Sequence, residues 1–273
     1  MPDDCGERCG ISGNDTKQKR TGKIHQPGGA YQGVSERILK KCTDRILTLI
    51  YPKVCPFCGK ISSEGICADC RDEVAYISEP RCMKCGKPLK QDTEEFCPDC
   101  LAGRSHVVQG GGLWPHREPV AGALYRFKYR NRRHFGRIFA RELADQYMDQ
   151  IGRWGIEEII PIPLHISRRR SRGFNQAEIL ARELSDATGI PMRKDVLFRV
   201  KKTSPQKALG KRERRGNLKG AFAVSRTWKA RKNVLLIDDI YTTGSTIEKA
   251  AEMLKKAGVQ NVYFLTISIG QGI

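Results

Sequence analysis

Four Cys-x-x-Cys pairs between residues 55 and 100 constrain this chain more than any other feature. A gap of two residues lets both sulfurs of one turn reach a single tetrahedral ion, and two such pairs complete a closed site of four thiolates. The segment holds few large apolar side chains, so bound metal is expected to supply much of its folding free energy. The eight thiols belong to Cys55, Cys58, Cys67, Cys70, Cys82, Cys85, Cys97 and Cys100.

The cysteine spacing predicts a double zinc ribbon built from one repeated unit. The first half reads Cys-x2-Cys-x8-Cys-x2-Cys and the second reads Cys-x2-Cys-x11-Cys-x2-Cys. Sequential pairing gives one metal site in each half, whereas an interleaved cross-brace would group the same residues differently. Iron, redox-active dithiols and disulfides are the alternative uses of these thiols. Because four thiolates leave no open coordination position, the one or two Zn2+ ions are expected to be structural.

Composition predicts three parts in the chain. Residues 1–34 are polar and rich in glycine, which predicts a disordered tail. Residues 35–104 are predicted to form a short helix followed by the double zinc ribbon. From residue 105 to 273, strands alternate with helices, which is typical of an α/β domain with a parallel sheet. Helices are expected at 120–129, 135–151, 176–188 and 245–257, and strands at 156–162, 233–237 and 262–267.

The charge of the chain indicates what kind of partner it binds. Forty-nine Lys and Arg against thirty Asp and Glu give a formal net charge of +19, which favours nucleic acid or phosphorylated ligands. No apolar run approaches the length of a membrane span, so no span is expected. The N-terminus lacks the pattern of a secretory signal, and a cytoplasmic location, where thiols stay reduced, is expected.

The strongest signal for a ligand site is a buried strand that leads into two acids and a glycine turn. Asp238 and Asp239 follow four apolar residues, at the end of a strand where ligands of open parallel sheets bind. Carboxylates there accept hydrogen bonds from vicinal sugar hydroxyls or hold a hydrated Mg2+ ion. Adjacent acids also begin turns for structural reasons alone.

A phosphate cradle is predicted directly after these acids. Residues 242–246 lead into a helix, whose N-terminus carries partial positive charge, and their amide and hydroxyl groups are suited to a phosphate monoester. Together with the acids, this loop predicts a site for a ribose 5-phosphate. The loop residues are Thr242, Thr243, Gly244, Ser245 and Thr246.

Three sequence segments resemble a known family. Residues 234–246 are similar to the phosphoribosyl-pyrophosphate-binding signature of type I phosphoribosyltransferases. Residues 161–165 and 168–176, the latter ending in Arg-Gly-Phe-Asn-Gln, resemble the ComF family, which also carries an N-terminal double zinc ribbon. The similarity extends over about residues 40 to 270. Further matches to the family pattern are Thr203, Gln206, Leu209, Arg214, Asn217, Ala221 and Phe222.

The resemblance implies a fold and a division of roles. The expected fold is a type I phosphoribosyltransferase-like parallel sheet flanked by helices, with a small N-terminal double zinc ribbon. Asp238 and Asp239 are the catalytic candidates that meet the ribose hydroxyls, while residues 242–246 hold the 5-phosphate. Mg2+ with phosphoribosyl pyrophosphate is the expected cofactor and substrate pair. The pyrophosphate side is expected to involve Pro163, Leu164, Arg172 and Lys128.

Two functions follow from this resemblance. The first is a magnesium-dependent phosphoribosyltransferase acting on an unidentified acceptor, with the basic stretch at 199–220 closing as a hood over the site. The alternative to a hood is a disordered basic loop. The second function is that of a non-catalytic protein of competence and DNA uptake. Such a protein would bind single-stranded DNA and DNA-uptake proteins, and would use the pocket as a ligand sensor.

Overall fold

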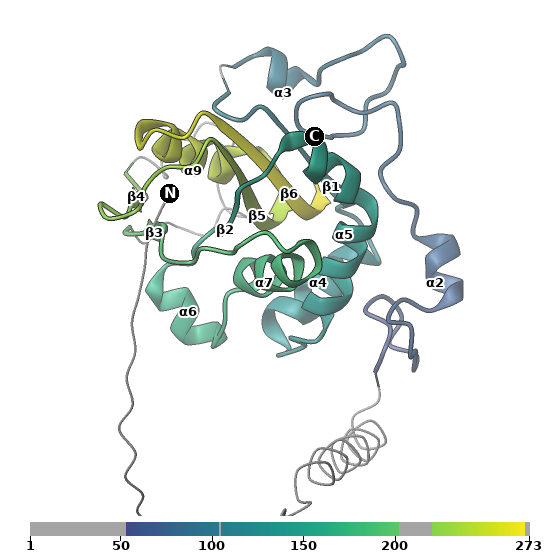
Figure 1. Ribbon diagram of the computed structural model, residues 1–273. Helices are drawn as coiled ribbons and strands as arrows, with labels where there is room; N and C mark the ends of the chain where they lie inside the picture. The colour runs from purple at the N-terminus through teal and green to yellow at the C-terminus, as the bar shows by residue number, and fades with distance from the viewer. Residues whose placement is uncertain (1–52, 104, 202–219, 271–273) are drawn as a thin grey trace, which may run out of the picture. The chain divides into compact units, whose positions relative to one another are not determined.

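The computed structural model describes residues 53–103, 105–201 and 220–270. The predicted tail, the helix expected near residues 35–51 and most of the expected hood lie outside the described residues. The division of the chain at residues 34/35 and 104/105 stays a prediction. The described part is built around one parallel sheet, with the two cysteine-rich ribbons joined to it (Figure 1).

The sheet has four parallel strands in the order β1-β6-β5-β2. Strands β5 and β6 therefore lie in the middle, where both neighbours supply hydrogen bonds. The strands span Gln109–Pro115 (β1), Glu158–Pro161 (β2), Asn233–Tyr241 (β5) and Asn261–Ile269 (β6).

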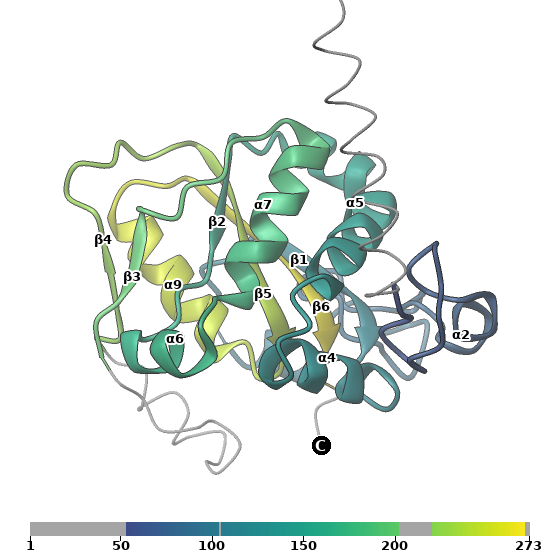
Figure 2. The ribbon, with the colours of Figure 1, turned by 90° about the horizontal axis from the view of Figure 1, so that it is seen from below.

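The apolar run of β5 is explained by burial of both faces of the sheet. Leu235 and Ile237 belong to a cluster with side chains of α5 and α7, whereas Val234 and Leu236 belong to a second cluster with side chains of α9. Figures 1 and 2 show these helices on opposite sides of the sheet. A strand buried on both faces has no polar side to alternate with its apolar one, which gives a continuous hydrophobic run.

The helices agree closely with the sequence pattern. Both α4 (Val120–Tyr129) and α7 (Gln176–Thr188) have the predicted bounds. Helix α5 (Phe135–Trp154) runs three residues further than predicted and ends where Gly155 adopts the left-handed conformation, with φ 59°. Helix α9 spans Ser245–Lys256.

The predicted end of β5 was wrong. The strand continues to Tyr241, and Asp238 lies opposite Thr266 of β6 within the paired region. The run of consecutive buried residues ends at Ile237, but the backbone ladder to β6 continues for four more residues, to Tyr241, which is buried again. The two acids therefore lie on a fixed strand and not on a loop.

Outside the ribbons, four elements of the described residues were not predicted. Strand β1 contains three consecutive glycines, a composition that is unusual in strands. Here close packing explains them: a Cβ atom at Gly110 would lie 2.2 Å from the Phe264 ring, and one at Gly111 would lie 2.5 Å from Tyr147 Oη. The others are α6 (Ile166–Arg172), β3 (Leu197–Arg199) and β4 (Phe222–Val224), of which β3 and β4 pair antiparallel.

The two ribbons join different sides of the sheet. The first ribbon, residues 55–70, shares the buried cluster of α5 and α7, and the second ribbon, residues 82–100, shares the buried cluster of α9. Each contributes one short helix, α2 (Ala68–Glu73) and α3 (Pro98–Leu101).

Candidate functional site

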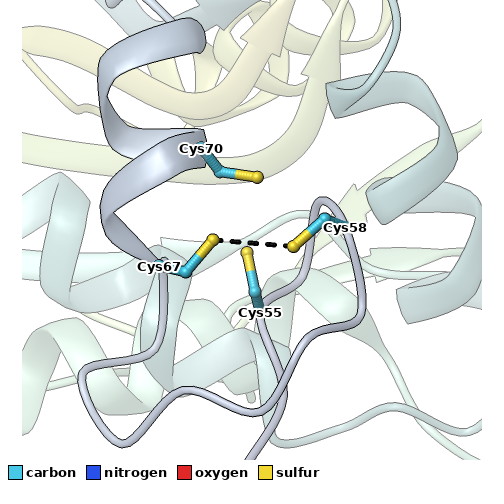
Figure 3. Close-up of side chains that lie close together, drawn as sticks. All are labelled: Cys55, Cys58, Cys67 and Cys70. Atoms are coloured by element: carbon cyan, nitrogen blue, oxygen red, sulfur yellow. Dashed lines mark hydrogen bonds between the residues drawn. The ribbon is translucent and has the colours of Figure 1, made fainter.

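The eight cysteines form two groups of four. Cys55, Cys58, Cys67 and Cys70 make the first, and the Sγ atoms in each group all lie within 4.8 Å of one another (Figure 3). The second group is Cys82, Cys85, Cys97 and Cys100. The pairing is therefore sequential, and the interleaved cross-brace is excluded.

The spacing of the sulfurs fits a tetrahedral ion. A Zn–S bond of about 2.3 Å places the four sulfurs of a site about 3.8 Å apart. The Sγ atoms of Cys58 and Cys67 are 3.5 Å apart, and those of Cys85 and Cys97 are 3.6 Å apart. Four thiolates in each group supply a complete donor set, which supports a structural role for Zn2+.

The ribbons repeat a local ion pair as well as their cysteines. Lys60 Nζ lies 2.8 Å from Asp69 Oδ2 in the first ribbon, and Lys87 Nζ lies 2.7 Å from Asp99 Oδ2 in the second. In both ribbons the backbone N–H of the first cysteine donates to the backbone carbonyl of this lysine, with an N–O distance of 2.8 Å. The repeat that the cysteine spacing predicts therefore also includes a backbone hydrogen bond and a Lys–Asp ion pair.

The two acids of β5 occupy different environments. Lys128 Nζ on α4 lies 2.9 Å from Asp239 Oδ1, and both side chains are largely buried. Asp238 accepts from the backbone N–H of Asp239 at 2.8 Å. Burial, and then the charge of Asp239, raise the pKa of Asp238 to about 7, although Lys128 and Arg199 oppose the rise. Near neutral pH, therefore, Asp238 is poised between its two protonation states.

The loop after the acids has the geometry of an anion cradle. Gly244 is the N-cap of α9 and adopts the left-handed conformation with φ 73°, which non-glycine residues rarely do. Thr243 Oγ1 and Ser245 Oγ lie 2.9 Å apart. No side chain of the described residues caps α9. The positive end of this helix is therefore directed at the space beside the loop.

The pyrophosphate-side candidates come from three places, the turn between β2 and α6, the end of α6, and α4. Pro163 and Leu164 connect β2 to α6 and are half-buried. The turn is fixed from both sides, because the N–H of Ile162 donates to Ile237 O at 2.9 Å and His165 Nδ1 caps α6 by accepting from Ser167 N at 3.3 Å.

The Arg-Gly-Phe-Asn-Gln string mostly builds the turn between α6 and α7. Gly173 ends α6 in the left-handed conformation, with φ 76°. Asn175 caps α7 and its amide donates to Ile162 O at 3.0 Å. Buried Phe174 packs near Phe127, with ring centres 6.0 Å apart. Most residues of this string therefore have a structural role, because they form the turn between α6 and α7.

Arg172 is held by two side chains, one of which, Gln176, ends the Arg-Gly-Phe-Asn-Gln string. It donates to Gln176 Oε1 at 3.1 Å and to Tyr129 Oη at 2.9 Å. Tyr129 directly follows Lys128, so α4 brings both basic candidates to the same region. Sequence reasoning missed Arg199 as an individual residue. Its positive charge opposes the rise in the pKa of Asp238. The contact of Arg172 with Tyr129 and the proximity of Arg199 to Asp238 join segments far apart in the chain, so no local pattern predicts them.

Two protein families match the chain, one over each part of the molecule. Residues 46–101 match the double zinc ribbon domain, and residues 136–268 match the phosphoribosyl transferase domain. The chain therefore pairs a structural metal module with a phosphoribosyltransferase-like domain. None of the described helices combines the length and apolar character that a membrane crossing requires.

Named relatives resemble the chain over most of its length. Competence protein F of Haemophilus influenzae is 34% identical over 207 residues, covering 74% of this chain and 89% of the relative. Competence protein ComFC of Bacillus subtilis is 26% identical, with coverage of 71% and 80%. DNA utilization protein YhgH of Escherichia coli K12 is 27% identical, with coverage of 72% and 94%. The chain belongs to the ComF family, and the predicted fold class is confirmed.

Proposed function

We propose that this protein binds phosphoribosyl pyrophosphate with Mg2+ at the carboxyl end of β5 and transfers the phosphoribosyl group to an acceptor. The observation that carries the proposal is the continuous unit of two partly buried acids, a left-handed glycine and the N-terminus of α9. Carboxylates suit a sugar diol, and a helix N-terminus suits a phosphate monoester.

Each part of the substrate has a candidate set of residues. Residues 242–246 hold the 5-phosphate, and Asp238 and Asp239 accept from the ribose hydroxyls. Lys128 Nζ lies 2.9 Å from Oδ1 of Asp239, so Oδ2 is the oxygen we assign to a hydroxyl. Lys128 and Arg172, with Pro163 and Leu164, serve the pyrophosphate side.

These groups favour departure of pyrophosphate from the anomeric carbon. Positive charge at Lys128 and Arg172 stabilises the charge that develops on the leaving group. Bound with the substrate, Mg2+ neutralises the diphosphate further. Asp238 is partly protonated near neutral pH, and its ionised form is the better acceptor for the ribose hydroxyls and the better partner for Mg2+, so affinity is expected to rise with pH.

Thermal unfolding tests this proposal directly. Phosphoribosyl pyrophosphate with Mg2+, at a hundredfold excess over Kd, is expected to stabilise the chain by about 2.7 kcal/mol and to raise Tm by roughly 5 to 10 °C. Pyrophosphate alone and ribose 5-phosphate alone, each with Mg2+, serve as controls and are expected to give smaller shifts. No shift with the complete ligand would contradict the proposed site.

The second function that we propose is non-catalytic handling of single-stranded DNA during DNA uptake in the cytoplasm. The names of the relatives, which refer to competence and DNA utilization, support this function, as does the net charge of +19. Exposed Arg169 and Arg170 on α6 are suited to phosphate contacts, and the site on β5 then acts as a ligand sensor.

Binding of a labelled oligonucleotide at increasing salt tests this second function. For single strands, log Kd rises with log salt by about 0.7 per phosphate contact. Replacing Arg169 and Arg170 together by Gln should lower that slope by about 1.4 if both arginines contact phosphates. A flat salt response would exclude the electrostatic mode of DNA binding. Release of pyrophosphate from phosphoribosyl pyrophosphate, measured alongside, separates an enzyme from a sensor.

A further inference from the structure

Tyr241 lies between the second ribbon and the phosphate loop, residues 242–246. It is the last residue of β5, it is buried, and its ring stacks on Phe264 with centres 4.6 Å apart and planes at 12°. A Cβ atom at Gly244 would lie 2.4 Å from Tyr241 Oη. The phenol therefore fills the space left by the absent side chain of Gly244, and the position of the ring determines the position of the loop.

The second ribbon also lies close to this ring. Lys87 Nζ lies 5.9 Å from the centre of the Tyr241 ring, and its ion pair with Asp99 is largely buried, with side chains 6% and 20% exposed. These two residues belong to the two halves of the metal site, since Lys87 follows one Cys-x-x-Cys pair and Asp99 lies inside the other. Three of the four cysteines share one buried cluster with Tyr241 and Phe264.

A separate contact connects the end of the second ribbon to α9. Glu248, in the first turn of α9, accepts from Ser105 Oγ and from the backbone N–H of His106, the latter at 2.9 Å. Ser105 and His106 come shortly after the last cysteine of the ribbon. The phosphate loop is thus flanked on both sides by elements that contact the ribbon region, Tyr241 before it and the first turn of α9 after it.

The first ribbon uses the same repeated unit in a different way. Its equivalent ion pair, Lys60 with Asp69, is exposed, at 69% and 72% of the side chains. This ribbon contacts α4 and α5, where Arg126 donates to the Phe57 carbonyl at 2.9 Å and Arg71 pairs with Glu142 at 3.0 Å. One protein therefore holds two chemically similar metal sites, of which the second lies beside Tyr241, the residue that precedes the phosphate loop.

We propose that Tyr241 is a positioning residue that makes ligand binding at the phosphate loop depend on metal in the second ribbon. Without the metal, the two Cys-x-x-Cys pairs separate, the Lys87–Asp99 pair loses its geometry and Tyr241 is no longer held against Gly244. Thermodynamic linkage requires the reverse effect as well, so ligand binding stabilises metal at the second ribbon. This inference rests on the proposed function of the loop.

Alkylation of the cysteines in the zinc-loaded protein, followed by mass spectrometry of the two ribbon peptides, tests the linkage. Phosphoribosyl pyrophosphate with Mg2+ is expected to slow alkylation of the second ribbon about tenfold and that of the first less than about twofold. Equal protection of both ribbons, or none despite a ligand-induced rise in Tm, would overturn the inference. No rise in Tm at all would overturn the proposed function, and this inference with it.

Substitutions of Tyr241 and Lys87 separate positioning from general stability. Tyr241→Phe keeps the ring and is expected to bind within about twofold of the unaltered protein, whereas Tyr241→Leu weakens binding about tenfold and loses the selective protection. Lys87→Met has a matched control in Lys60→Met, and only Lys87→Met should weaken binding. Zinc content should stay the same in all four variants. Unchanged affinity and protection in Tyr241→Leu would overturn the inference.

Discussion

Removal of zinc is expected to unfold both ribbons and to destabilise the whole described part of the chain. Zinc contributes about 10 to 16 kcal/mol of apparent free energy in small zinc-folded domains at neutral pH. Here the ribbon side chains are also part of the domain clusters: Phe57 is buried beside Trp114, with ring centres 5.3 Å apart. Loss of the first ribbon therefore exposes apolar surface on β1 and α5.

Trp114 fluorescence measures this effect. Trp114 is 1% exposed and also stacks on Tyr76, 5.5 Å away, so its emission reports on contacts near the first ribbon. With the other two tryptophans, Trp154 and Trp228, replaced by Phe, a strong chelator should shift the emission to longer wavelength. Zn2+ should reverse the shift and Mg2+ should not. Unaltered emission and an unaltered Tm after complete metal removal would contradict a structural role for the metal.

Replacing both acids of β5 by amides is expected to abolish binding of phosphoribosyl pyrophosphate with Mg2+. Asp238→Asn and Asp239→Asn remove the charges that hold the sugar and cation, and they leave Lys128 without its carboxylate partner. Two charge-assisted contacts at about 1.5 to 3 kcal/mol each predict a loss in affinity of more than about a hundredfold. Calorimetric titration measures it. Asp149→Asn, an exposed acid on α5, is the matched control and should bind normally.

The same substitution at Asp238 has a pH-dependent effect on stability. The pKa of Asp238 is raised to about 7 in the folded protein, so between pH 4 and 7 the folded state holds a proton that the unfolded state releases. Its contribution to stability is therefore present at low pH and is lost as pH rises through about 7. From pH 5 to pH 8, the unfolding free energy should fall by about 2 to 4 kcal/mol more than in Asp238→Asn. A parallel pH profile for the two proteins would contradict the raised pKa.

Much of the fold could be predicted because local spacing determines it. The Cys-x-x-Cys pairs fix two metal sites, and the apolar periodicity of α4 and α7 fixes their bounds. Strand β1 could not be predicted, since its glycines are explained only by Phe264 and Tyr147 packing against them. The extension of β5 through its acids likewise depends on pairing with β6.

The candidate site could be predicted only where it is continuous in sequence. The acids and the phosphate loop form one continuous segment, so the strand, the turn and the start of the helix could be predicted from the same stretch of sequence. The partners that set their properties come from elsewhere: Lys128 from α4, Arg199 from β3 and the second ribbon behind Tyr241. Which residue pairs with which acid depends on how distant helices cross the end of the sheet.

A crystal structure of the zinc-loaded protein with phosphoribosyl pyrophosphate and Mg2+ would test the central claim most directly. The proposed function predicts density for the 5-phosphate against residues 242–246, with the ribose hydroxyls within hydrogen-bond distance of Asp238 and Asp239. Density for the ligand at any other place, with Lys128 and Asp239 still paired and the loop empty, would contradict it.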